Sequence, residues 1–163
     1  MVIFFRFGQN NRKGVTTMMM GRDLCGLPVF SWREGNYIGR VADFFINGKT
    51  KTLFGISLGK TFPRKRYRYV DAGRICRIYK DGVIITSSEH IESLRFIGED
   101  AVSYLDFTRD TAVFLREGEV VSDLIFDDRF AIDGYEISGG LWNDLVRGRT
   151  YRPRLDKIRQ ISK

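Results

Sequence analysis

The stretch that decides the fold is Gly21–Leu58, GRDLCGLPVFSWREGNYIGRVADFFINGKTKTLFGISL. Short apolar runs alternate with polar turns in it, and the turn Asn47-Gly48 separates two strand-like runs, Tyr37–Ile46 and Thr52–Leu58. Asn-Gly between apolar runs predicts a β-hairpin, because both central residues of a type I′ turn need a positive φ. The stretch therefore predicts an antiparallel β-meander with little helix.

The order of the landmarks in this stretch resembles a known family. The segments Gly21-Arg22-Asp23-Leu24, Gly26-Leu27-Pro28-Val29, Gly39–Asp43 and Leu53–Ile56 resemble the opening of a PRC-barrel domain. This is the small β-barrel of the photosynthetic reaction centre H subunit, also found in a ribosome maturation factor. The resemblance implies a mainly β fold, and for function it implies docking on other proteins.

A weaker copy of the same pattern follows in the carboxyl half. Val121–Asp128 matches Val41–Gly48, and Ile132–Ser138 takes the place of Leu53–Ser57. Val113–Val120 matches Phe30–Tyr37 in the same way, although the "G-x-P-V" opening is missing. We therefore expect two small PRC-barrel-like antiparallel β-barrels in tandem, at residues 18–92 and 93–163. Asp43 and Asp123 recur at matching places, so we expect each to cap a turn in its own barrel.

The segments outside the two units give three further expectations. Ser87–Leu94 has a serine cap, early acids and apolar residues three apart, which predicts a short connecting helix. Residues 1–17 do not fit the pattern and are interpreted as a flexible arm or an over-extended start; the alternative is a strand at Val2–Phe7 that augments a sheet edge. The chain stops before the final strand of the family pattern, which leaves an edge open to the N-terminal tail, a partner or a second copy.

Composition argues for a folded chain without a reactive centre. Apolar residues make up 43% of the 163 residues, which is enough for a core. His90 is the single histidine, and Cys25 and Cys76 have neither metal-ligand spacing nor a disulfide framework. No apolar run is long enough to span a bilayer. We expect a cytoplasmic protein that is not an enzyme and holds no metal or cofactor, and peripheral contact with a membrane remains open.

The positive charge is concentrated rather than spread. Residues 1–20, 61–70 and 147–163 together carry more than the whole net charge of +7, so the rest of the chain is net acidic. In two of these segments cations alternate with tyrosines, at equivalent places in the two units. They supply the predicted contact surface, which consists of Arg64, Lys65, Arg66, Tyr67, Arg68, Arg147, Arg149, Arg152 and Arg154.

The leading hypothesis for function is a non-enzymatic adaptor that docks on a protein partner through these basic, tyrosine-containing strands. The first alternative is an RNA- or ribosome-associated assembly factor that uses the same surface, since clustered cations and stacking aromatics also suit nucleic acid. An anionic membrane surface and a small-ligand enzyme are the others. The structural alternative is that the arginines only protect edge strands from aggregation.

Overall fold

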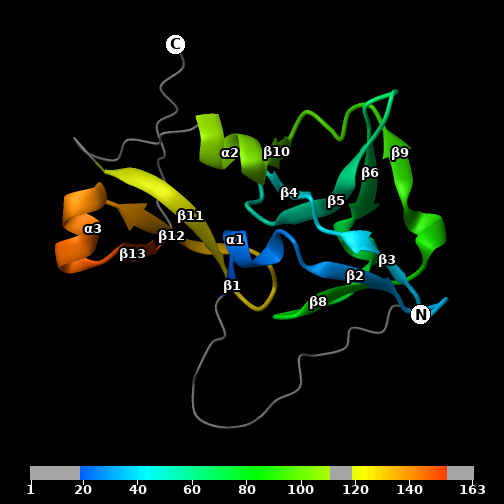
Figure 1. Cartoon of the computed structure of the whole chain (residues 1–163), viewed down its shortest axis with the longest axis horizontal. Helices are drawn as coiled ribbons and strands as arrows, with labels where there is room; N and C mark the ends of the chain where they lie inside the picture. The colour runs from blue at the N-terminus through cyan, green and yellow to red at the C-terminus, as the bar shows by residue number, and fades with distance from the viewer. Residues whose placement is uncertain (1–18, 111–118, 154–163) are drawn as a thin grey trace, which may run out of the picture.

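The computed structural model describes residues 19–110 and 119–153, and it is mainly β, as the sequence predicts (Figure 1). The strands are β1 (Met19–Met20), β2 (Pro28–Ser31), β3 (Tyr37–Arg40), β4 (Asp43–Asn47), β5 (Leu53–Thr61), β6 (Arg66–Asp71), β7 (Ile75–Tyr79), β8 (Gly82–Ile85), β9 (Glu92–Leu94), β10 (Ala101–Ser103), β11 (Val120–Phe126), β12 (Ile132–Ser138) and β13 (Thr150–Pro153). The helices are α1 (Gly21–Leu24), α2 (Tyr104–Asp110) and α3 (Leu141–Arg147), with 3₁₀ turns at Ala72–Arg74 and Ser88–His90.

Two sheets pack face to face in the amino-terminal part. One has the strand order β3-β2-β8-β7 and the other β10-β4-β5-β6-β9. The chain passes from the first to the second at Val41-Ala42, where the Val41 N–H donates to the Leu27 carbonyl and the Ala42 N–H to the Ser57 carbonyl. Alternate residues of the strands face inward and form one buried core, which includes Val29, Val83, Phe44, Ile56 and Val70.

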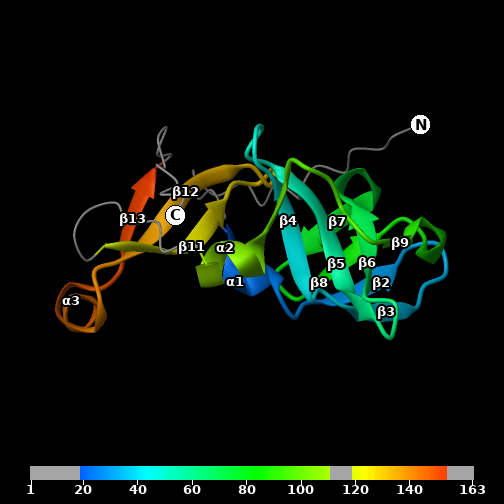
Figure 2. The same ribbon diagram turned by 90° about the horizontal axis from the view of Figure 1, so that it is seen from above.

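A third sheet, in the order β1-β11-β12-β13, lies at the other end of the molecule (Figures 1 and 2). Its central hairpin, β11–β12, has the same register as the hairpin β4–β5. Leu124 pairs with Tyr135 as Phe44 pairs with Ile56, and Ile125 pairs with Gly134 as Phe45 pairs with Gly55. One β-bulge follows at the same step in each hairpin, so the two match residue by residue, including the irregularity.

The loops of these two hairpins also bond to each other. The Leu53 N–H donates to the Phe130 carbonyl (2.9 Å), and the Ile132 N–H donates to the Lys51 carbonyl (2.8 Å). Lys51 and Phe130 both have the left-handed backbone conformation, with φ of 59° and 57°. The two bonds exchange equivalent partners, which is the pattern of a local two-fold axis between the hairpins.

A strand and a helix from each half of the chain pack against the other half. β1 pairs with β11 and leads into α1, while β10 pairs with β4 and leads into α2. The Asp123 carboxylate accepts the Arg22 N–H at the start of α1 (3.2 Å), and the Asp43 carboxylate accepts the Leu105 N–H at the start of α2 (3.1 Å). Each aspartate therefore caps a helix from the other half, whereas we had expected a turn in its own barrel.

Two local expectations are wrong in detail. The turn after Asn47 is longer than two residues, because the Asn47 side chain accepts the N–H groups of Lys49 and Thr50 and the left-handed residue is Lys51. Ser87 is a cap, as predicted, but the helix ends after one 3₁₀ turn. The residues that follow, Glu92–Leu94, form a strand that pairs with β6. Residues 1–17, Val113–Gly118 and Arg154 lie outside the described residues.

Gly55 gives a test of the packing on β5. Tyr69 donates its hydroxyl to the Phe54 carbonyl (2.8 Å), and its ring covers Gly55 so closely that an added Cβ would lie 2.5 Å from Cε2. We expect Gly55→Ala to lower the free energy of unfolding by about 2 kcal/mol through overpacking. Urea unfolding measures this, with Gly48→Ala as control, because a Cβ there meets nothing closer than 3.4 Å. Equal stability of the two variants would contradict the placement of Tyr69.

The exchange of helices predicts how the amino-terminal half behaves alone. A fragment of residues 18–92 lacks α2, the β10 edge and the Tyr104 ring that stacks on Phe44 at 4.4 Å. We expect this fragment to lose the cooperative urea transition of the full chain, and to regain it when mixed with residues 93–163. Circular dichroism and tryptophan fluorescence follow both steps. Cooperative unfolding of the isolated fragment at full-chain stability would show that the exchange is dispensable.

Candidate docking surfaces and the polar junction between the halves

The basic segment at residues 61–70, the first of the two that contain tyrosines, lies on β6 and on the hairpin turn that precedes it. The Tyr67 and Tyr69 rings pack edge to face on Phe45, with ring centroids 5.6 and 6.2 Å apart. Arg66 and Arg68 alternate with these tyrosines and project from the other face of the strand. The sequence thus predicts the two faces of β6 correctly, and the tyrosines serve to pack the sheet.

The tip of the β5–β6 hairpin carries cations that are not neutralised. Within residues 19–110 and 119–153, neither Arg64, Lys65, Arg66 nor Arg68 has an ion-pair partner. Arg64 and Lys65 are exposed, and Phe62 beside them is 90% exposed. The tip therefore combines free positive charge with an exposed aromatic ring.

In the second basic segment, which lies on β13 and just before it, acidic side chains pair with two of the arginines. Arg149 bonds to Glu136 (3.0 Å) and lies 3.5 Å from Asp144, and Arg152 bonds to Glu119 (2.9 Å). Acids of the same chain therefore neutralise both arginines, while Arg147 is exposed at the end of α3. No local pattern predicts these pairs, because the acids come from β12, α3 and the residue before β11.

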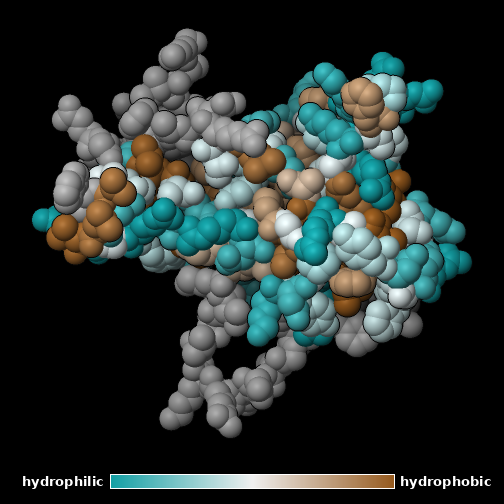
Figure 3. Space-filling model, in the orientation of Figure 1, coloured by the Kyte–Doolittle hydropathy of each residue, from teal (hydrophilic) through white to brown (hydrophobic). Residues whose placement is uncertain are grey.

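The two basic segments lie at opposite ends of the molecule, with β13 beside α3 at one end and β6 at the other (Figures 1 and 2). They do not form one continuous surface. The α3 end also differs in polarity, since Leu141, Leu145 and Val146 are each more than 70% exposed and produce the brown tip in Figure 3. Of the two basic segments, the one at the β5–β6 tip thus keeps more unpaired cations among the described residues.

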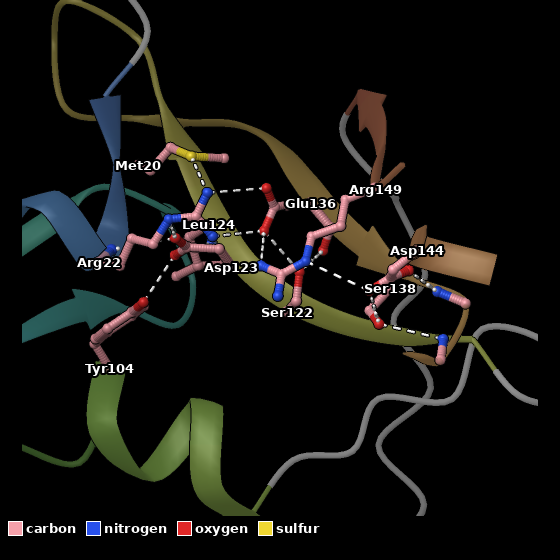
Figure 4. A network of polar contacts seen from close by, with 12 residues as sticks. Met20, Arg22, Tyr104, Ser122, Asp123, Leu124, Glu136, Ser138, Asp144 and Arg149 are labelled. Atoms are coloured by element: carbon pink, nitrogen blue, oxygen red, sulfur yellow. Dashed lines mark hydrogen bonds and ion pairs between the residues drawn. The ribbon is translucent and has the colours of Figure 1, made fainter. Parts of the chain in front are cut away.

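A polar junction that the sequence did not reveal joins the halves (Figure 4). The Arg22 guanidinium, from α1, donates to both oxygens of Glu136 on β12, at 2.7 and 3.0 Å. Arg149 and the Ser122 hydroxyl donate to the same carboxylate at 3.0 and 2.9 Å. These bonds, the Arg22 pair first among them, lower the pKa of Glu136 from 4.5 to about 2.

Asp123 lies next to this pair and is fully buried. The Tyr104 hydroxyl donates to it at 2.8 Å, and the Arg22 Nε lies 3.6 Å away. Desolvation raises the pKa of Asp123 and of Tyr104, and it raises the pKa of the half-buried Cys25 thiol to about 12. The high pKa keeps this thiol protonated and therefore a poor nucleophile at neutral pH.

Gly21 shows why the α1 opening has its sequence. A Cβ on Gly21 would lie 2.6 Å from the Tyr104 ring and 2.8 Å from the Asp123 carboxylate. Helix α1 can therefore pack this closely against Tyr104 and Asp123 only with glycine at position 21. The glycine and the recurrence of Asp123 at the place of Asp43 are the sequence signals that point to this junction. Arg22 and Glu136 are 114 residues apart, and no local pattern links them.

In the parts of the chain that the structure describes, no three His, Cys, Asp or Glu side chains are grouped to hold a metal ion. The helices among those residues are too short or too polar to cross a bilayer. His90 lies in the 3₁₀ turn of Ser88–His90.

The lowered pKa of Glu136 predicts an acid-dependent loss of stability. A carboxylate whose folded pKa lies below its unfolded value stabilises the protein fully above about pH 4.5, and this contribution disappears as the pH falls towards 2. Urea titrations between pH 6 and 2.5 should show Glu136→Gln losing up to about 3 kcal/mol of that pH dependence. The exposed Glu99→Gln is the matched control. Identical pH slopes for both variants would mean that the Arg22 pair does not hold Glu136 ionised.

Comparison with known proteins agrees with the fold. The uncharacterized protein YrrD of Bacillus subtilis (strain 168) is 26% identical over 151 residues, which cover 90% of this chain and 85% of that protein. The similarity therefore continues past the first two sheets into the carboxyl half. The sequence model of the PRC-barrel domain matches residues 17–90, the part that contains β1 to β8. Residues 17–90 of this chain thus carry a PRC-barrel domain.

Proposed function

We propose that the protein is a non-enzymatic adaptor that docks on a protein partner. The observation that carries this proposal is the tip of the β5–β6 hairpin, where the 90%-exposed Phe62 lies among the unpaired cations Arg64 and Lys65. The PRC-barrel domain at residues 17–90 supports it, because the tip belongs to that domain. The free thiols of Cys25 and Cys76 fit a cytoplasmic setting.

Charge and polarity together define the partner. Unpaired cations on a protruding tip create a positive potential that attracts acidic surfaces and speeds encounter. An exposed aromatic ring beside them can fill a pocket on the partner and exclude water, as aromatic anchors do in interfaces. The partner surface is therefore acidic with an apolar pocket. Lys60, whose Nζ lies 4.4 Å over the Tyr67 ring, extends the same charge along β5.

The β13 segment is proposed as a second, weaker contact. Arg149 and Arg152 are already paired with acids of the chain, so a partner acid would have to compete with Glu136 and Glu119. Exposed Arg147 is the described residue of this segment that is free to pair. We therefore assign the main contact to the β5–β6 tip.

We infer further that the carboxyl half is a reduced second copy of the PRC-like unit. The matched registers of β4–β5 and β11–β12, with a bulge at the same step, support this inference. So does the contact of Gly134 with the Tyr151 ring, which repeats the contact of Gly55 with Tyr69. In the second copy α3 occupies the place of the cationic tip, between β12 and β13, which is consistent with a docking role for one tip only.

Charge reversal at the tip tests the proposal. We expect Arg64→Glu with Lys65→Glu to abolish capture of the partner from a lysate of the source organism, because the acidic surface of the partner is then repelled. Capture is measured by quantitative mass spectrometry after cross-linking, with and without nuclease. The melting temperature should stay within about 2 °C, since neither side chain has an ion-pair partner among residues 19–110 and 119–153.

Lys80→Glu with Arg129→Glu is the matched control, with the same change of net charge on exposed residues outside the two basic segments. This variant should retain most of the captured partner. If both variants capture equally, the tip is not the docking surface. If capture disappears on nuclease treatment of the unmodified protein, the assembly-factor alternative replaces the protein-docking proposal.

A further inference from the structure

The outer face of the β3-β2-β8-β7 sheet is rich in exposed aromatic side chains. Trp32 is 74% exposed, Tyr37 55%, Phe30 41% and Tyr79 36%. These residues come from three of the four strands or from the position directly after a strand, which is a high density for one small sheet. The core does not need these aromatic rings, because Val29, Val83 and Ile85 fill the inward face of the same sheet.

The strand register places these rings in one layer. Phe30 pairs with Tyr37 on one side and with Ile84 on the other, and Ile84 pairs with Arg77, so the four side chains form a row across the sheet. The Trp32 N–H donates to the Ile85 carbonyl (2.8 Å), which continues the ladder and keeps Trp32 on the face of Phe30.

Within this row the rings are held by close contacts. Phe30 and Tyr37 pack edge to face with centroids 5.8 Å apart. The Arg77 guanidinium lies 4.9 Å from the centre of the Tyr79 ring. Gly82 has no side chain at the point where the Phe30 ring passes, 3.6 Å from the position of a Cβ. The result is a row of exposed aromatic rings set at an angle to one another, with one cation stacked on Tyr79.

The charged side chains within the four strands have one sign. The four strands, PVFS, YIGR, ICRIY and GVII, contain no acidic residue, and they carry Arg40 and Arg77. Aromatic rings and arginines on the same strands, with the acids Glu34 and Asp81 confined to the adjoining turns, complement a ligand that has flat π-faces and negative charge. Unpaired bases on a phosphate backbone have both properties.

We propose that the outer face of the β3-β2-β8-β7 sheet binds single-stranded nucleic acid, with bases stacked on Phe30, Trp32 and Tyr37 and phosphates near Arg40 and Arg77. The site is separate from the cationic β5–β6 tip and goes beyond the proposed docking on protein. A duplex is not a ligand, because its bases present no free faces to a sheet.

Trp32 itself reports the binding. In a Trp142→Phe background, Trp32 is the remaining tryptophan, and its fluorescence is titrated with the ten-nucleotide probes rU10, rA10, dT10 and dA10 at physiological salt. We expect saturable quenching by at least one probe and none by an rA10–rU10 duplex. If RNA and DNA probes quench alike, base stacking alone accounts for the binding. If only the RNA probes quench, the protein also contacts the 2′-hydroxyl group.

Variants separate this face from the rest of the surface. Trp32→Leu and Tyr37→Leu should each weaken binding of a fluorescein-labelled probe about tenfold in anisotropy, since one stacked base is lost. Phe62→Ala, an exposed ring outside the sheet, and the Arg64→Glu, Lys65→Glu pair should change it less than about twofold.

Three results would overturn the proposal. The first is no quenching by any single strand, and the second is equal quenching by the duplex. The third is an equal loss of affinity in Phe62→Ala and Trp32→Leu, which would move binding away from this face. Quenching by poly-glutamate without quenching by the oligonucleotides would assign the face to an acidic protein. Failure of this test leaves capture by the β5–β6 tip unaffected, because that measurement uses different residues.

Discussion

The rest of the structure depends on two buried carboxylates, Asp43 and Asp123, each of which caps a helix that the other half supplies. A buried carboxylate is stable only if donors surround it, and each of these accepts the N–H of the next residue in its own strand as well as the N–H at the helix start. The donors come from both halves, so neither half satisfies its aspartate alone. This requirement ties the strand exchange, the stacking of Tyr104 on Phe44 and the Arg22–Glu136 pair into one unit.

The exchange also explains where surfaces remain for binding. The hairpin loops meet at the local two-fold, and the short helices cover the junction, so the middle of the molecule is occupied by its own contacts. What stays outside is the cationic β5–β6 tip, the aromatic face of the β3-β2-β8-β7 sheet and the apolar α3. The first two lie within residues 17–90, the part that matches the PRC-barrel domain.

The contrast between the two basic segments shows how a charge pattern can mislead. Arg66 and Arg68 alternate with tyrosines, and Arg149 and Arg152 lie on either side of Tyr151, so the sequence predicts the same role for both sets. In the fold, Glu136, Asp144 and Glu119 neutralise the second set, because β12, α3 and β11 meet there. Free charge is therefore a property of tertiary neighbours and not of the segment that carries it.

The sequence by itself determined the mainly β fold, the PRC-barrel landmarks and the match between Asp43 and Asp123, because alternation, turn residues and spacing are local properties that a chain keeps when it folds. Tertiary structure alone decided that each aspartate caps the helix of the other half, that Arg22 meets Glu136 across 114 residues, and which cations stay unpaired. It also turned Glu92–Leu94 into a strand against a helical pattern, since pairing with β6 satisfies more backbone groups than one further helical turn. Contacts between distant segments leave no periodic trace in the sequence, so they had to be seen in the fold.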